Sequence, residues 1–355
     1  MPEISPSEWL LVIPLLSGLA AFVFILVLTP FAGKMRLLDL PDARKRHREP
    51  TPMVGGIAIY LVLMAVLLVV SPPAKLAWMM ASATILVVVG FLDDVFDLGW
   101  RTRMAAQFGA TCLMIFGSGL YIESLGFNVW GLDNLGWFGI GLTVFAVLCL
   151  TNGFNMLGGV DGLAAGHVLV VIGSLAAVQL LNHGTLVQPV WLSVLAAVVF
   201  AFWLVNMSLT PLRRVFLGDA GSLLLGFVVC WLLVYYSQEP IAAVVPAAVL
   251  WCAALPIMDT ALVIFRRIAR GKSPFEADRI HLHHLFIDLG VPPRRALGLM
   301  LTLAVVINTI GLLTVYLVSP FWGLVLFAVV SALFAWCVTH RSVEDRFIRR
   351  FGLAD

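Results

Sequence analysis

Apolar runs long enough to cross a membrane follow one another along almost the whole chain, and they restrict its fold more than any other feature. A helix needs roughly 20 apolar residues to cross about 30 Å of hydrocarbon. No water reaches the backbone inside a bilayer, so each spanning run must be helical. The composition agrees, because 61% of the residues are hydrophobic and 12% are charged, about half the charged fraction of a soluble domain. We therefore predict an all-α, polytopic integral membrane protein.

About eleven spans can be marked, and together they form one integral domain over residues 1–355. They cover residues 8–29, 54–70, 76–92, 104–122, 136–150, 160–182, 189–207, 222–237, 241–266, 296–318 and 321–340. The first run is not typical of a cleavable signal peptide, because Glu3 and Glu8 replace the positive flank and the run is too long. We expect it to remain as a helix. The five cysteines lie singly inside spans, without metal-site spacing.

The positions of lysine and arginine predict the orientation. All 22 of them except Lys75 lie in or beside the loops after the first, third, seventh and ninth spans, or in the C-terminal tail. Such an excess is typical of cytoplasmic loops. We therefore predict a periplasmic N-terminus, a cytoplasmic C-terminus and an active site on the cytoplasmic face. The loops expected to form that site are 30–53, 93–103, 151–159, 208–221 and 267–295.

Acidic residues gather at the cytoplasmic ends of the spans. In GFLDDVFDLG at 90–99, Asp93 and Asp94 are adjacent and Asp97 follows one turn later. Like charges at a low-dielectric boundary repel unless a cation relieves them. Mg²⁺ suits this role, because it takes one or two carboxylates and completes its shell with water and phosphate. Asp219, in the turn LGDAG, adds a carboxylate on the same face. A set of ordinary solvated helix ends is the alternative.

The stretch TNGFNMLGGVDGLAAGH at 151–167 separates two apolar runs with polar residues and glycines. Asn152 and Asn155 precede a glycine turn, and Asp161 opens the next span, near a helix N-terminus that favours anions. Glycines let a ligand approach the backbone closely. We interpret the stretch as the floor of a site. A hinge or a glycine-rich packing face is the alternative.

Two basic loops lie on the same face. The loop after the first span contains Lys45 and His47, which suit phosphate oxygens but also ordinary anchoring at the membrane. The segment DRIHLHH in the largest loop contains an arginine and three histidines: Arg279, His281, His283 and His284. The abundance of lysine and arginine there favours diphosphate or sugar binding over zinc, and a purely structural cluster is the third possibility.

The ninth span is expected to bend within the membrane. It contains Pro246 and Pro256, and proline interrupts the helical hydrogen bonds. A bent helix would open a groove for a lipid tail.

Five segments together resemble the polyprenyl-phosphate N-acetylhexosamine-1-phosphate transferase family. They are RKRHREPTPMVGGIAI at 44–59, GFLDDVFDL at 90–98, NGFNMLGGVDGLAAG at 152–166, FLGDAGSLLLG at 216–226 and SPFEADRIHLHHLFIDLG at 273–290. DRIHLHH and the preceding LPIMD look most like the bacterial branch that transfers GlcNAc-1-phosphate to undecaprenyl phosphate. The branch that transfers phospho-MurNAc-pentapeptide ranks second, and other UDP-N-acetylhexosamine donors stay open.

The resemblance implies that undecaprenyl phosphate attacks the β-phosphorus of a UDP-N-acetylhexosamine, yielding a lipid diphosphate sugar and UMP. This would be the first membrane step of O-antigen, common-antigen or other cell-envelope polysaccharide synthesis, at a bacterial inner membrane. It implies Mg²⁺, with Mn²⁺ as a substitute. Membrane lipids are further expected partners, nucleic acid is not, and a homodimer is left open.

The resemblance also implies roles for the matching residues. The metal ligands would be Asp219, Asn155 and Asp93. The catalytic residues would be Asp93 and Asp94, which orient or deprotonate the lipid phosphate, and Asp161, which helps to hold the nucleotide or metal. The substrate-binding residues would be Lys45, His47, Asn152, Asn155, Arg279, His281, His283 and His284.

One departure from the family pattern stands in the glycine turn. The family reads N-M-x-D-G-x-D-G-L, and this chain has Gly158 in place of the first aspartate. The loss would weaken nucleotide or metal contacts, shift the donor preference or mark an inactive lipid-binding homologue; we favour an active enzyme. A secondary transporter is the rival from another class, but transporters place ionisable residues near mid-span. Only Asp259 comes near that position.

Overall fold

The computed structural model describes residues 6–40, 49–70, 72–127, 134–269, 271 and 281–339. The predictions at Lys45, His47 and Arg279, and those for the C-terminal tail, lie outside these residues. The described helices are α1 (Pro6–Leu28), η1 (Thr29–Phe31), α2 (Gly55–Val69), α3 (Ala74–Phe96), α4 (Trp100–Ser118), α5 (Gly136–Leu157), α6 (Leu163–His183), α7 (Pro189–Asn206), α8 (Gly218–Ser237), α9 (Pro246–Cys252), α10 (Ala254–Ala269), α11 (Leu282–Asp288), α12 (Pro293–Leu317) and α13 (Pro320–Thr339).

These helices confirm an all-α, multi-pass membrane fold. Each predicted span coincides with one of them or, for residues 241–266, with the pair α9 and α10. In the described parts of the chain, eight helices are long and apolar enough to cross a membrane, and the bent pair makes a ninth span. α2 is apolar but has only 15 residues, and α4 begins with a tryptophan and two arginines. The number eleven and the sides of the two termini stay predictions.

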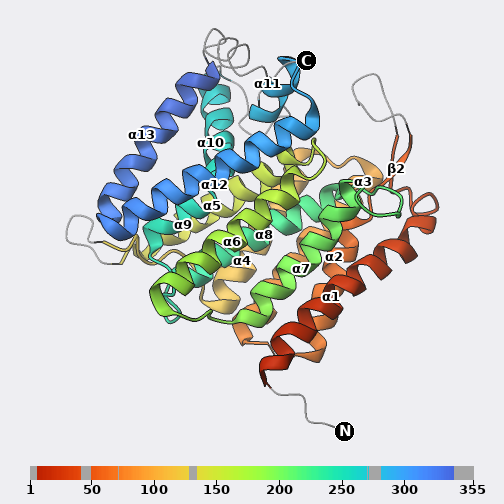
Figure 1. The fold of residues 1–355 in the computed structure, drawn as a ribbon, viewed down its shortest axis with the longest axis horizontal. Helices are drawn as coiled ribbons and strands as arrows, with labels where there is room; N and C mark the ends of the chain where they lie inside the picture. The colour runs from red at the N-terminus through yellow and green to blue at the C-terminus, as the bar shows by residue number, and fades with distance from the viewer. Residues whose placement is uncertain are drawn as a thin grey trace.

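The core of the bundle is α8, which crosses its middle in Figure 1. The apolar window of α8 is 100% buried, against 11% for α13 at the edge. Glycines bring the neighbours of α8 very close to its first turn. A Cβ on Gly56 of α2 would collide with Cα of Gly221, and one on Gly90 of α3 would lie 2.5 Å from Cα of Ala220. The start of α8 is therefore clamped between α2 and α3.

A short antiparallel pair of strands lies next to this contact between α2, α3 and α8. β1 (Leu38–Asp39) pairs with β2 (Thr51–Pro52), which leads into α2. The amide of Phe216 donates to the carbonyl of Pro52 at 2.7 Å, and the amide of Gly55 donates back to Phe216 at 3.0 Å. Backbone bonds thus join the loop before α2 to the loop before α8.

The predicted bend in the ninth span is confirmed. α9 and α10 meet at 81°, and Pro256 lies in the first turn of α10. The break frees carbonyls in the membrane, where unpaired polar groups are costly. Asn308 of α12 satisfies one of them, because its Nδ2 donates to the carbonyl of Cys252 at 2.9 Å. A cavity of about 340 Å³, lined mainly by apolar side chains of α5, α8, α9 and α10, lies beside the bend.

Candidate active site

The described parts of the predicted site loops meet at one end of the bundle. β2 and α11 lie at one edge of the molecule in Figure 1, and the start of α1 lies at the opposite edge. α3 and α5 end at the first edge, where α4, α6 and α8 begin. Side-chain bonds described below connect these termini directly. The acidic helix ends therefore share one end of the bundle, and the assignment of this end to the cytoplasm stays a prediction.

Asp93 and Asp219 share one arginine. Nη1 of Arg103, in the first turn of α4, lies 2.8 Å from Oδ2 of Asp93 and 3.4 Å from Oδ2 of Asp219. The amide Nδ2 of Asn155, near the end of α5, donates to Oδ1 of Asp219 at 2.7 Å. Four helices thus bring these groups together. We call Asp93, Asp94, Asn155, Arg103 and Asp219 the acidic cluster.

Asp94 lies in the same cluster but accepts hydrogen bonds from the backbone. Its carboxylate accepts the amide of Asp219 at 2.8 Å and that of Ala220 at 3.3 Å. These are first-turn amides of α8, so Asp94 caps the helix from outside, where the helix dipole stabilises a negative charge. Gly218 makes the approach possible: its φ is +70°, and a Cβ there would lie 2.6 Å from Oδ2 of Asp94. The carboxylate of Asp94 therefore positions Asp219.

The acidic cluster fits a divalent cation. Oδ1 of Asp93 is buried and has no hydrogen-bond partner in the described structure. Asp93 shares Arg103 with Asp219, and Asp219 is bonded to the amide of Asn155. Two carboxylates and an amide are sufficient for Mg²⁺, which keeps several waters and binds phosphate. In the same described residues, no three His, Cys, Asp or Glu side chains form a group that could hold a metal. The fit for Mg²⁺ therefore depends on two carboxylates and an amide, and not on three acidic side chains.

Asp161 is held in a different ion pair. Its Oδ2 lies 2.8 Å from Nη1 of Arg214, in the loop before α8. The next residue, Gly162, has φ +77°, and a Cβ there would lie 2.5 Å from Sδ of Met207. The amide of Gly162 also donates to Oδ1 of Asn206 at 2.6 Å. The start of α6 is thus fixed against the end of α7, with Asp161 and Arg214 partly exposed beside it.

Asn152 is occupied in helix packing. Its Nδ2 donates to Oε1 of Gln107 at 2.6 Å and to the carbonyl of Leu148 at 2.8 Å. Gln107 is fully buried in α4. The side-chain amides of Asn152 and Gln107 therefore join α5 to α4. A contact of Asn152 with substrate stays a prediction.

The histidines form a second group, in which His281 and His283 are buried. Nδ1 of His281 lies 2.8 Å from Oδ2 of Asp259, in α10. The rings of His281 and His283 stack with centroids 5.8 Å apart, and those of His283 and His284 lie 4.1 Å apart. We call Asp259, His281, His283 and His284 the histidine cluster.

His283 is neutral at physiological pH. Burial, together with the neighbouring His284 and His281, lowers its pKa to about 3. Neither ring nitrogen has a hydrogen-bond partner in the described structure. His283 is therefore able to donate one hydrogen bond and accept another, but it supplies no positive charge to a phosphate.

The stretch at 151–167 lies between the two clusters. Asn155 reaches Asp219 at its beginning, and a Cβ on Gly159 would lie 3.4 Å from Nε2 of His283. Gly158 is exposed, has φ −62° and would place a Cβ near only the carbonyl of Asn155. The stretch therefore contacts both clusters, and its interpretation as the floor of a site stays a prediction.

Sequence reasoning misses Arg103. The residue stands in WRTR, where an arginine is typical of anchoring at the membrane surface. Its position in the first turn of the helix that directly follows Asp93, Asp94 and Asp97 is the available signal. The chain reverses direction between α3 and α4, and this reversal brings the side chain of Arg103 to the carboxylates of Asp93 and Asp219.

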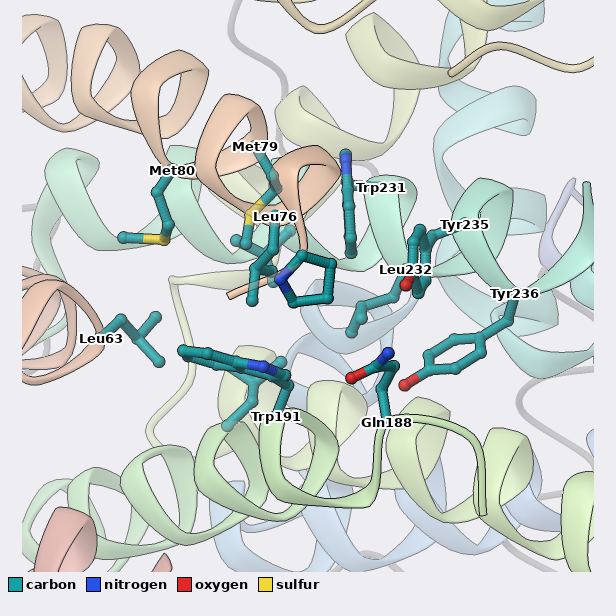
Figure 2. A pocket seen from close by; sticks show the side chains of 13 residues that line it. Leu63, Leu76, Met79, Met80, Gln188, Trp191, Trp231, Leu232, Tyr235 and Tyr236 are labelled. Atoms are coloured by element: carbon teal, nitrogen blue, oxygen red, sulfur yellow. The ribbon is translucent and has the colours of Figure 1, made fainter. Parts of the chain in front are cut away.

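The cavity in Figure 2 lies at the other end of the same helices. Its walls include Pro73, just before α3, and Tyr236, near the end of α8, whereas Asp93 and Asp219 lie at the opposite ends. The volume is about 40 Å³, and the lining is apolar and aromatic apart from the amide of Gln188. None of the lining residues is charged. Phosphate chemistry therefore has no support there.

Comparison with known proteins covers nearly the whole chain. Residues 76–237 match glycosyl transferase family 4. The chain is 36% identical to the undecaprenyl-phosphate alpha-N-acetylglucosaminyl 1-phosphate transferase of Yersinia pestis, over 94% of this chain and 92% of that protein. Proteins of the same name from Escherichia coli K12 and Haemophilus influenzae are 35% and 33% identical, over 92% and 94% of this chain and 90% and 95% of theirs.

Proposed function

This chain belongs to glycosyl transferase family 4, and we propose that it transfers GlcNAc-1-phosphate from UDP-GlcNAc to undecaprenyl phosphate. A phosphate oxygen of the lipid forms a bond to the β-phosphorus of the donor, the bond to the UMP oxygen breaks, and the products are undecaprenyl diphosphate GlcNAc and UMP. The observation that carries the proposal is the acidic cluster, in which Arg103 joins Asp93 to Asp219 beside Asn155.

The side chains match what phosphoryl transfer requires. The reaction depends mainly on neutralising negative charge and on in-line positioning. Asp219, Asp93 and Asn155 would hold Mg²⁺, which supplies charge neutralisation at the diphosphate when bound. Asp94 holds Asp219 in place through the backbone of α8. A phosphate monoester has its second pKa near about 6 and is largely ionised at neutral pH, so a strong general base is unnecessary.

Arg103 is suited to a phosphate as well as to the carboxylates. A guanidinium has five N–H donors, and Arg103 reaches both Asp93 and Asp219 through the same nitrogen, Nη1. Its side chain is 29% exposed. We assign it to orienting the diphosphate next to the cation. His281, His283 and His284 would contact the sugar or nucleotide across the turn at Gly158 and Gly159.

The apolar cavity beside the bend suits part of the prenyl tail. It lies between α5, α8 and the pair α9 and α10. Thr260, on its wall, follows Asp259 of the histidine cluster directly. A tail in this cavity would thus run close to the reacting groups, with its remainder in the bilayer. This geometry also favours a multi-pass protein of the bacterial inner membrane with its site on the arginine-rich, cytoplasmic face.

Asp259 weakens the transporter alternative. Its carboxylate is buried and bonded to His281 and to the amide of Leu282, at the end of the bundle where the other site residues lie. It is therefore a fixed structural partner near the site, whereas ion-coupled transport needs an ionisable group that exchanges its ion at mid-span.

Turnover of the purified protein tests the proposal. With undecaprenyl phosphate, Mg²⁺ and radiolabelled UDP-GlcNAc, we expect label in the lipid fraction and release of UMP in equal amounts. A chelator should stop the reaction, and added Mg²⁺ or Mn²⁺ should restore it. A panel of UDP-N-acetylhexosamines identifies the preferred donor. If no donor gives product, the result would favour the alternative suggested by Gly158, namely that the protein is an inactive homologue that binds lipid.

A further inference from the structure

Asp259 makes two contacts that converge on one short segment. Its side chain is 3% exposed. Oδ2 lies 2.8 Å from Nδ1 of His281, and Oδ1 accepts the amide of Leu282 at 3.0 Å. A buried carboxylate is costly unless its oxygens are paired. Both oxygens of Asp259 are paired, and both partners belong to the beginning of α11.

These contacts define the state of His281. A nitrogen beside a carboxylate oxygen carries the hydrogen, so Nδ1 of His281 is the donor. In the neutral ring, Nε2 is then an acceptor. This Nε2 is buried, and in the described residues it has no hydrogen-bond partner. The ring therefore presents one defined polar atom that the surrounding protein does not satisfy.

The same carboxylate places the following residues. Leu282 is the first residue of α11, and its amide is anchored to Asp259. His283 follows one residue later, and both its ring nitrogens also lack partners in the described structure. Its Nε2 faces Gly159, because a Cβ on that glycine would lie 3.4 Å away. The two neighbouring rings thus carry three unsatisfied nitrogens, and one of these, Nε2 of His283, lies beside the turn between α5 and α6.

We propose that Asp259 is the positioning residue of the histidine cluster. It holds His281 in the Nδ1–H form and anchors the start of α11, so that the polar atoms of His281 and His283 are directed at the donor bound over the α5–α6 turn. The inference rests on the proposed function for the identity of the donor. It assigns Asp259 no contact with substrate, since both its oxygens are occupied.

Asp259→Asn is the first test, because it keeps the shape of the side chain and removes its charge. The matched control is Asp288→Asn, which changes an exposed carboxylate at the end of the same helix. We expect kcat/KM for UDP-GlcNAc to fall about 10- to 100-fold, the range found for carboxylates that orient metal-bound histidines. The KM for undecaprenyl phosphate should stay within about twofold of the wild-type value. An unchanged kcat/KM would overturn the proposal.

A double-mutant cycle separates positioning from a general structural effect. If Asp259 acts through His281, the effects of Asp259→Asn and His281→Gln on kcat/KM should be strongly non-additive. In the His281→Gln background, Asp259→Asn should then change kcat/KM by less than about threefold. Additive effects would mean that Asp259 does not act through His281.

Nitrogen-15 NMR of histidine-labelled protein reads the tautomer directly, without substrate. The wild type should show His281 with hydrogen on Nδ1, and Asp259→Asn should lose that signature. Adding UDP-GlcNAc to the wild type should shift the signals of His281 and His283. It should leave His183 unchanged, since that ring is bonded to the carbonyl of Ala243 at the opposite end of α6.

The wild-type spectra keep the proposal testable if Asp259→Asn does not fold. The proposal would be overturned if His281 carried its hydrogen on Nε2. It would also be overturned if the signals of His281 and His283 did not shift when the donor binds. If the wild type turns over UDP-GlcNAc while these NMR results are negative, the positioning role fails and the transferase function stands. If no donor is turned over or bound, the transferase function fails, and the tautomer of His281 still decides whether Asp259 holds the ring.

Discussion

The acidic cluster and the histidine cluster lie on two sides of the same glycine turn, but they are built differently. In the acidic cluster, charged groups from several helices share one partly exposed arginine. In the histidine cluster, one buried carboxylate holds a short helix whose central ring is neutral. Under the proposed function, charge is thus concentrated where a cation and a diphosphate would need neutralisation. The neutral ring of His283 would lie where a sugar or base needs recognition.

This difference predicts how each cluster responds to substitution. Loss of a charge in the acidic cluster should reduce kcat, because the proposed function places that charge next to the reacting phosphorus. A change in the histidine cluster should act mainly on binding of the donor and on folding. The following experiments test this division, beginning with the largest expected effect.

Asp219→Asn should remove turnover almost completely. The substitution deletes the negative charge that Asn155 and Arg103 surround, while an amide of similar shape preserves the first turn of α8. We expect kcat to fall by at least about 10²-fold, as for other single groups that stabilise charge in a transition state. Lipid product is measured with saturating Mg²⁺, and thermal unfolding checks the fold. The control is Asp97→Asn, at an exposed helix end. Near-normal turnover would remove Asp219 from the metal ligands.

Arg103→Lys should reduce kcat about 10- to 100-fold. Lysine keeps the positive charge but not the planar fork with which arginine holds two carboxylates and a phosphate. Arg101→Lys is the matched control, since Arg101 is exposed in the same turn and packs over Trp100. Initial rates at saturating substrates measure the effect. Equal rates for the two variants would show that Arg103 acts as a general positive charge.

Asp94→Asn should have a smaller effect on kcat than Asp93→Asn. An asparagine is still able to cap α8 with one oxygen, so Asp219 should stay close to its place. Because the substitution removes a negative charge from the N-terminus of α8, we expect Asp94→Asn to cost roughly 0.3–1 kcal/mol of stability, measured as a lower unfolding midpoint. Asp93→Asn should lower kcat with little change in that midpoint. The reverse ranking would make Asp94 a group that acts on substrate.

The comparison also shows how far sequence reasoning reaches. The helices are predictable from apolar length, and the shared face of Asp93 and Asp219 is predictable from the placement of lysine and arginine. The pairs of Arg103 with these carboxylates, and of Asp259 with His281, are not. Each depends on the direction in which a helix leaves a turn or a break. Pro256 predicts that the ninth span bends, but not that the bend brings Asp259 to a histidine 22 residues later in the chain.

Acidification should destabilise the fold through His283. The pKa of this ring is about 3 in the folded protein and about 6.5 in an unfolded chain. Between these values the unfolded chain binds a proton that the folded protein does not. The free energy of unfolding therefore falls as the pH falls, by up to about 1.4 kcal/mol per pH unit from this group.

Thermal unfolding from about pH 7.5 to about pH 5 measures this dependence. His283→Gln should flatten the curve, because the variant has no ring to protonate. His183→Gln, at the other end of α6, is the control and should leave the slope unchanged. Equal slopes for wild type and His283→Gln would assign the acid sensitivity to other groups.

Gly158→Asp should have the smallest effect, and it tests the turn between the clusters. Gly158 has φ −62° and is exposed, and a Cβ added there would lie 3.2 Å from the carbonyl oxygen of Asn155. A carboxylate at the end of α5 meets the negative end of the helix dipole, which costs roughly 0.3–1 kcal/mol. We expect kcat/KM for UDP-GlcNAc to stay within about threefold of wild type or to rise. Gly162→Asp is the contrasting variant, since φ +77° and the contact with Met207 make a side chain strained there.

The direction of any change in Gly158→Asp assigns the turn to one cluster. A lower Mg²⁺ concentration for half-maximal rate would show that position 158 faces the acidic cluster, because an added carboxylate strengthens cation binding. A changed preference among UDP-N-acetylhexosamines at constant Mg²⁺ dependence would show that it faces the histidine cluster. Loss of activity with an intact unfolding midpoint would show that substrate packs against the bare backbone at Gly158, so that the glycine itself is part of the binding surface.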